Sequence, residues 1–197
     1  NEDYLNSIKN PYLRNSYTSQ MILGMFGSVT YNTQGTGMDQ TFTVKGNLET
    51  SGNFLNLISV ISESRYHYNK DERYYNALGI RYAQYARAEA SFVFRQRVRN
   101  KGALLWRFLV AGGYAYGNTR SMPFERMIFA GGSTSMRGWQ VRTLGPGFVP
   151  QQPREFYPNQ VGDLKIETNL EQRFPIYGPV YGAIFLDCGN IWSNGKG

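Results

Sequence analysis

Two acidic side chains in the last part of the sequence, Glu171 and Asp187, are of a type that often works in pairs. Paired carboxylates act as general acid and general base in glycosidases. Such an enzyme needs supporting groups, but the sequence contains no nucleophile elbow and no residues with metal-ligand spacing. We therefore expect no enzymatic activity, no metal site and no cofactor, and the two carboxylates require a different role.

A glycine-rich segment at residues 131–139 reads Gly-Gly-Ser-Thr-Ser-Met-Arg-Gly-Trp. Glycine-rich segments can cradle phosphates, but a phosphate loop also needs Gly-Lys-Ser/Thr and a helix directly after it. Neither follows here, and a dinucleotide-binding fingerprint fails for the same reasons. We therefore expect no nucleotide at this segment.

The remaining residues with reactive side chains are a single histidine and a single cysteine. His67 lies in a basic, tyrosine-rich stretch far from any nucleophile pattern, and we expect a solvated loop residue there. Cys188 alone excludes an intramolecular disulfide and a cysteine-based metal site. The formal net charge of +7 is spread along the chain instead of forming one block, so we expect no nucleic acid partner.

The elements that position these residues are predicted to be strands, because apolar and polar side chains alternate with period two. In the clearest case Phe42, Val44 and Leu48 share one face, and charged or polar residues occupy the other. Six segments show such a pattern, near residues 20–33, 40–50, 83–98, 103–117, 163–174 and 180–192. The sequence therefore predicts an all-β, antiparallel protein.

The predicted strands are long, mostly ~10 to 14 residues, whereas strands of soluble domains are commonly ~5–6 residues long. A tilted strand needs ~9–11 residues to cross a membrane. Lys45, Arg107 and Glu167 lie in the middle of their strands, where a barrel would direct them into a wet lumen while the apolar face meets lipid. Strand length and patterning therefore favour a transmembrane β-barrel over a soluble sandwich.

The predicted connections alternate between short and long. Short connections lie near residues 34–39, 99–102 and 175–179, and long ones at 51–82 and 118–162. Outer-membrane barrels have short periplasmic turns at one end and long external loops at the other. We therefore expect the whole chain, residues 1–197, to form part of one barrel domain with two long external loops.

The first long loop contains apolar residues at helical spacing, namely Phe54, Leu57, Ile58 and Ile61. Spacing of i, i+3, i+4 and i+7 predicts a short amphipathic helix. We expect this helix to pack on the rim of the barrel, and a partner-binding helix is the alternative.

The core of the glycine-rich segment, Met136-Arg137-Gly138-Trp139, resembles the Val/Ile-Arg-Gly-Phe/Tyr motif of the BamA/TamA superfamily of outer-membrane assembly factors. In that superfamily the motif lies at the tip of the sixth external loop, which folds back into the barrel. The lead-in at residues 129–132, Phe-Ala-Gly-Gly, is also similar to the family's. We expect Gly138 to let the backbone turn tightly beside Arg137.

Two later segments extend the resemblance. Residues 170–175, Leu-Glu-Gln-Arg-Phe-Pro, resemble the family's twelfth strand, and residues 185–192 resemble the thirteenth, with its Phe-x-Asp-x-Gly-x-x-Trp pattern. Order and spacing agree across 129–192, while residues 1–116 are only compatible with the family. The resemblance implies a sixteen-stranded barrel, of which this chain supplies roughly strands eight to thirteen. Its set of long loops is also similar to TamA-like members from Bacteroidetes.

An arginine inside a barrel needs carboxylate partners, because an unpaired buried charge costs several kcal/mol. Glu171 and Asp187 fall on lumen-facing positions by parity, and the resemblance points to the same two positions as partners of Arg137. A simple hairpin centred on Tyr177, however, places Asp187 opposite Glu167 instead of Glu171. Glu167 therefore remains a further candidate partner.

The function implied by the resemblance is the folding and insertion of β-barrel client proteins into the bacterial outer membrane. The implied partners are outer-membrane lipids, unfolded β-barrel clients, and periplasmic or lipoprotein accessory subunits. Three alternatives stay open: a protein-secretion pore of the two-partner type, which shares the loop motif, a porin or structural surface barrel, and a soluble β-sheet binding module.

Overall fold

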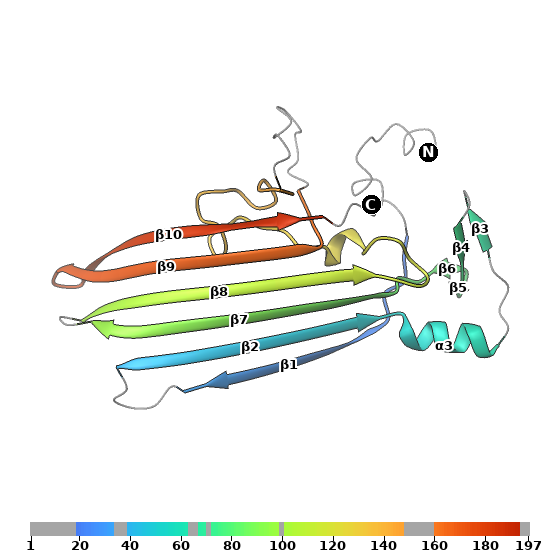
Figure 1. Ribbon diagram of the computed structural model, residues 1–197, viewed down its shortest axis with the longest axis horizontal. Helices are drawn as coiled ribbons and strands as arrows, with labels where there is room; N and C mark the ends of the chain where they lie inside the picture. The colour runs from blue at the N-terminus through green and yellow to red at the C-terminus, as the bar shows by residue number, and fades with distance from the viewer. Residues whose placement is uncertain are drawn as a thin grey trace.

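The main body of the protein is one six-stranded antiparallel sheet with the strand order β1-β2-β7-β8-β9-β10 (Figure 1). The computed structural model describes residues 19–33, 39–62, 67–69, 72–98, 101–147 and 160–193. The six strands are β1 (Gly24–Asn32), β2 (Gln40–Ser51), β7 (Tyr85–Val98), β8 (Gly102–Ala115), β9 (Leu164–Tyr177) and β10 (Val180–Trp192). The predicted all-β architecture with six long strands is confirmed. Within the described ranges, no helix is long and apolar enough to cross a membrane.

The strand ends differ from the predicted ones at two places. The first strand begins at Gly24, and Met21 before it forms an isolated bridge with Tyr82. At the last hairpin, β9 continues through Pro175 to Tyr177 although a turn was expected over 175–179. Pro175 is tolerated because the register shifts beside it, which relieves the ladder of a bond that proline cannot donate.

Alternation along the strands gives the sheet two chemically different faces. On one face, called here the outer face, large apolar side chains are exposed, including Leu48, Trp106, Phe108, Ile166, Ile184 and Leu186. The opposite face, called the lumen face, carries the charged positions Glu49, Glu89, Arg107, Lys165, Glu167, Glu171 and Asp187. An exposed apolar face of this extent is expected where lipid replaces water.

Aromatic side chains gather on the outer face toward the two ends of the strands. Near the short turns, the ring of Phe42 packs at a tilt against that of Phe94, with centroids 5.1 Å apart. The ring of Phe92 meets Trp106 edge-on at 5.7 Å. At the long-loop end, Tyr114 stacks on the ring of Tyr116. Aromatic girdles of this kind flank the apolar band of outer-membrane barrels.

The first long loop holds one helix and two small hairpins. Helix α3 (Asn53–Ile61) forms where the apolar spacing predicted it. Strands β3 (His67–Asn69) and β4 (Glu72–Tyr74) pair with each other, as do β5 (Asn76–Ala77) and β6 (Ile80–Arg81). His67, expected as a loop residue, begins β3, and its side chain lies outside the described part of the chain.

The second long loop folds back onto the lumen face. It leaves β8, forms the 3-10 turn η1 (Phe124–Arg126), and packs two groups of apolar side chains against the sheet. One group brings Met122, Met127 and Val161 of the loop against Ala83 and Tyr85. The other brings Ile128, Ala130 and Met136 against Leu109, Ala111 and Ile191. The loop is therefore anchored to the lumen face by two hydrophobic clusters.

Candidate functional site: the inward-folded loop and its charged clamp

The tip of the second loop turns on two consecutive glycines. Gly131 and Gly132 have φ angles of +99° and +93°, in the left-handed region that favours glycine. The amide N–H of Gly132 donates to the carbonyl of Trp139 at 2.9 Å, which closes the loop around the motif. A side chain at Gly131 would collide with the carbonyl oxygen of Gln140.

Arg137 and Gly138 form the centre of a tight turn, which is closed by a hydrogen bond from the Trp139 N–H to the Met136 carbonyl at 3.0 Å. The expected turn beside Arg137 is therefore present. It does not require a glycine, because Gly138 is not among the residues with positive φ and a Cβ added to it would meet no atom within 4 Å. The neighbouring motif residues differ in burial, because Met136 is buried in the loop core and Trp139 is exposed.

Arg137 reaches from the loop tip to Asp187 in the middle of β10. The Arg137 Nε donates to Asp187 Oδ2 at 2.9 Å, and Nη2 donates to Oδ1 at 2.8 Å. The backbone N–H of Arg137 adds a third hydrogen bond to Oδ2 at 3.0 Å. Bidentate pairing of this kind fixes the orientation as well as the position of a guanidinium group.

Glu171 on β9 binds the same guanidinium from another side. Its Oε2 accepts a hydrogen bond from Arg137 Nη1, while its Oε1 pairs with the exposed Arg173. The guanidinium also lies over the ring of Phe185, 3.8 Å from the ring centroid. A cation over an aromatic face is attracted by the ring quadrupole, so Phe185 holds Arg137 in addition to the two carboxylates.

The hydrogen bonds of Arg137 keep it charged. The hydrogen bonds that Arg137 donates to the Asp187 carboxylate raise the pKa of its guanidinium above the already high usual value. Partial burial lowers this pKa, and the hydrogen bond to Glu171 raises it further. The loop tip therefore carries a permanent positive charge held between two strands.

Glu167 is not a partner of Arg137, which corrects one of the candidate pairings. Its side chain is 0% exposed and pairs with Lys165 Nζ at 2.7 Å and with Arg107 Nη1 at 3.3 Å. Its Oε2 also accepts a hydrogen bond from Ser135 Oγ at 2.6 Å. Glu167 therefore forms a second charged cluster that holds the loop two residues before Arg137.

Ser135 lies at the centre of this second cluster. Lys165 Nζ donates to Ser135 Oγ at 2.9 Å, and Ser135 in turn donates to the Glu167 carboxylate. The cluster thus joins the loop to two consecutive lumen-facing side chains of β9.

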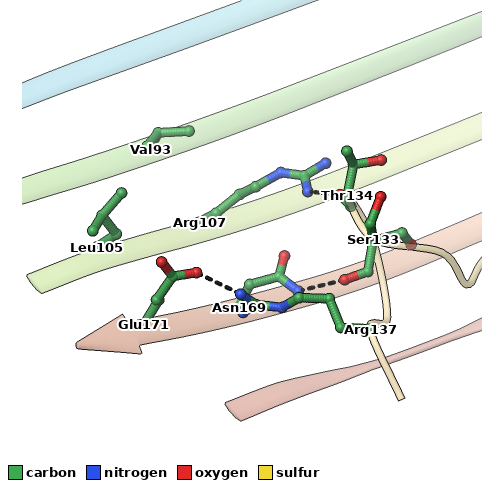
Figure 2. Close-up of a pocket in the computed structure, with 9 residues that line it drawn as sticks. Val93, Leu105, Arg107, Ser133, Thr134, Arg137, Asn169 and Glu171 are labelled. Atoms are coloured by element: carbon green, nitrogen blue, oxygen red, sulfur yellow. Dashed lines mark hydrogen bonds and ion pairs between the residues drawn. The ribbon is translucent and has the colours of Figure 1, made fainter. Parts of the chain in front are cut away.

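Two further hydrogen bonds tie the loop backbone to the wall between these clusters. Arg107 donates to the carbonyl of Thr134, and Asn169 Nδ2 donates both to the carbonyl of Ser135 and to Asp187 Oδ1, each at 3.0 Å. Arg107, Asn169 and Glu171 line an open pocket of about 180 Å³ between the loop and the sheet (Figure 2). Val93 and Leu105 form its apolar wall.

A third contact lies nearer the start of the loop. Arg126 of η1 pairs with Glu49 on β2 at 3.5 Å. Tyr85 donates its hydroxyl to the same carboxylate at 2.6 Å, and Arg87 lies 3.9 Å from it. The loop thus touches the lumen face through Glu49 on β2, Glu167 and Glu171 on β9, and Asp187 on β10.

The structure brings Arg137, Glu171 and Asp187 together and separates Glu167 from them. Sequence reasoning missed Phe185, Asn169 and Ser135. Parity could have found the first two. Phe185 lies two residues before Asp187 and so shares its face, and Asn169 lies between Glu167 and Glu171 on the same face. Nothing in the sequence marked Ser135.

An antiparallel sheet with an apolar outer face, a charged lumen face and an inward-folded arginine loop defines a section of an outer-membrane β-barrel wall. The family model for the Omp85 superfamily domain matches residues 13–197, and the chain belongs to this superfamily. The BamA/TamA-type resemblance, the all-β barrel architecture and the location in the bacterial outer membrane are therefore confirmed.

The chain is also similar to a curated relative, the outer membrane protein assembly factor BamA of Neisseria meningitidis serogroup B (strain ATCC BAA-335 / MC58). The two are 32% identical over 88 residues, which is 42% of this chain and 10% of the relative. The matched residues thus cover about a tenth of the length of that relative.

Proposed function

We propose that this chain is the loop-bearing wall of an outer-membrane assembly factor that folds and inserts β-barrel client proteins. Membership of the Omp85 superfamily and the similarity to an assembly factor support the proposal. The observation that carries it is the clamp on Arg137, which joins the tip of the second loop to β9 and β10 through Glu171 and Asp187.

In this proposal the clamped loop works as an internal strut and not as a chemical centre. A client strand is added to a barrel by pairing with an exposed strand edge, which supplies main-chain hydrogen bonds. An edge can guide a client only if the wall behind it keeps its register, and a one-residue slip would turn every side chain to the other face. The clusters around Arg137 and Glu167 hold the register of β8, β9 and β10 in this way.

The partners in this proposal are unfolded β-barrel proteins, the lipids around the outer face and periplasmic or lipoprotein accessory subunits. No cofactor, metal or chemical step is part of it.

The test is the rate at which an unfolded client barrel folds into lipid vesicles that contain the full-length protein. We expect faster folding than with empty vesicles, and a loss of that acceleration in Arg137→Ala. Arg97→Ala is the matched control, because Arg97 is an exposed lumen-face arginine near a short turn. No acceleration by the wild type would overturn the proposal.

A protein-secretion pore of the two-partner type is the second candidate, because it shares the arginine loop motif. In the same vesicles a secretion pore would release its client to the other side instead of leaving it inserted. Recovery of a protected, soluble client inside the vesicles would therefore favour the pore, and recovery in the membrane fraction favours the assembly factor.

A further inference from the structure

Helix α3 packs on the barrel with its polar side. The buried or half-buried positions of the helix are Leu55, Asn56 and Ser59, so this side is mostly polar. Phe54, Leu57, Ile58 and Ile61 are exposed. These four apolar residues share one face at i, i+3, i+4 and i+7 spacing. The helix thus packs at the rim as expected, but its apolar stripe faces away from the protein.

The polar side of α3 is attached to residues of the outer face. Asn53 Oδ1 accepts hydrogen bonds from Tyr116 Oη at 2.8 Å and from Gln84 Nε2 at 3.2 Å. Asn56 Oδ1 accepts one from Tyr82 Oη at 3.2 Å. A helix held at these points lies on the side of the sheet that meets lipid, and not over the lumen.

Alternation establishes that these anchors belong to the outer face. Ala83 and Tyr85 pack against Met122 of the inward-folded loop, so they point into the lumen. Gln84 lies between them and points the other way. Tyr116 is stacked on the exposed Tyr114, which shares the outer face with Trp106 and Phe108.

The same tyrosines mark the level of the membrane boundary. From Trp106 to Tyr116 the strand direction advances by about 34 Å at ~3.4 Å per residue, which corresponds to about 26 Å of height at a strand tilt of ~40°. The apolar band of an outer-membrane barrel is about 25 Å tall and is flanked by aromatic girdles. Tyr114 and Tyr116 therefore lie at the girdle of the long-loop end, and α3, which continues from the end of β2 in Figure 1, begins beside them.

The composition of the helix also fits a lipid boundary. Residues 53–62, Asn-Phe-Leu-Asn-Leu-Ile-Ser-Val-Ile-Ser, contain no charged side chain. Contiguous exposed apolar surface marks a contact with a membrane or a partner. At nine residues α3 is too short to span a bilayer, so a membrane contact of this helix would lie at the interface.

We propose that α3 is an interfacial helix that inserts Phe54, Leu57, Ile58 and Ile61 among the acyl chains of the leaflet at the long-loop end. The helix extends the lipid-contacting surface of the barrel beyond the ends of β1 and β2. The proposal rests on the membrane location of the protein and does not depend on the assembly-factor function.

The test is the solvent environment of a spin label on α3 in the full-length protein, refolded into dimyristoylphosphatidylcholine vesicles in a Cys188→Ser background. Leu57→Cys carries the probe, and Leu48→Cys on the outer face of β2 is the matched lipid control, because both leucines are 56% exposed. Gln140→Cys, exposed in the second loop, is the aqueous control. We expect the label at Leu57 to be accessible to oxygen and shielded from a water-soluble nickel chelate, as at Leu48.

The remaining outcomes overturn the proposal in distinguishable ways. Accessibility to the nickel chelate like that at Gln140 means that α3 projects into water. Low accessibility to both reagents means that protein covers the helix, and dipolar broadening between labels identifies the cover as a second copy. Ile61→Cys provides a second probe position on the same stripe in case the label at Leu57 prevents folding, which a shift in gel mobility on heating would reveal.

Discussion

Asp187 accepts three hydrogen bonds from Arg137, a residue 50 positions earlier in the chain. Two come from the guanidinium and one from the backbone N–H, so the carboxylate fixes the loop backbone as well as its side chain. A lysine at position 137 could replace the charge but not the planar pair of donors. The contact therefore joins the tip of the second loop to β10 at a defined height in the barrel.

Removing either partner of this contact is expected to destabilise the barrel strongly. Asp187→Ala leaves the Arg137 guanidinium with Glu171 alone, and loss of one partner of a buried pair costs about 3–5 kcal/mol. We expect Arg137→Ala to lower the free energy of unfolding by a similar amount, with Glu171→Ala acting in the same direction. Urea unfolding of the full-length protein in detergent micelles, followed by tryptophan fluorescence, measures these losses.

Because the two residues act as a unit, the double variant with both alanines is expected to lose little more than either single variant. Losses that add up within about 0.5 kcal/mol would show that Arg137 and Asp187 act independently and would contradict the pairing. Arg173→Ala is the control, since Arg173 is exposed and its ion pair with Glu171 is expected to contribute less than about 1 kcal/mol.

Glu167 is expected to be as important as the motif arginine although it does not touch it. Glu167→Gln keeps the shape of the side chain but removes the negative charge that faces Lys165 and Arg107. Two cations would then lie together without a counter-ion, and we expect a loss of about 3 kcal/mol or more in the free energy of unfolding.

The matched control for this substitution is Glu125→Gln, which changes an exposed carboxylate on η1. A surface change of this kind is expected to stay within about 0.5 kcal/mol. Equal effects of the two substitutions would mean that the buried cluster contributes nothing to holding the loop. Resistance of the second loop to protease digestion gives an independent readout of the same contact.

Substitution by alanine is expected to lower stability at Gly131 but not at Gly138. Gly131→Ala forces a side chain into a left-handed conformation and against the carbonyl of Gln140, so a cost of about 1–3 kcal/mol and a displaced loop tip are expected. Gly138→Ala meets open space at an ordinary φ and is expected to leave stability unchanged. Denaturant midpoints of both variants decide this, and a loss confined to Gly138→Ala would reverse the assignment.

The strands and their two faces could be predicted from the sequence because each face carries its own chemistry. On β9, Lys165, Glu167 and Glu171 alternate with apolar residues, and this pattern alone assigns the lumen face. Register was harder to predict. A hairpin centred on Tyr177 would pair Asp187 with Glu167, but the turn lies at Gly178–Pro179 and a register shift follows it, so Asp187 faces Asn169.

The orientation of α3 could not be predicted because an apolar stripe indicates a buried face without saying what buries it. In a soluble protein the stripe of Phe54, Leu57 and Ile58 would pack against the rest of the protein. Here the hydrogen bonds of Asn53 and Asn56 select the other side of the helix. Side-chain partners of this kind, separated by 26 to 63 residues, leave no periodic signal in a sequence.

Cys188 offers a test of the outer face that needs no new residue. It is exposed on β10 and follows the lumen-facing Asp187, so alternation directs it toward lipid together with Leu186. In the full-length protein embedded in vesicles, we expect Cys188 to react with a membrane-permeant apolar maleimide and to resist a charged, water-soluble one. Unfolding in urea should make it reactive to both.

The opposite face supplies the control. Lys45→Cys, placed in a Cys188→Ser background, lies on the lumen face of β2, where water enters the barrel and a charged maleimide can follow. Protection at position 188 combined with labelling at position 45 requires a wall with one lipid face and one wet face. Labelling of Cys188 by the charged reagent in intact vesicles would mean that β10 turns its apolar side chains away from lipid, and the assignment of both faces would then have to be exchanged.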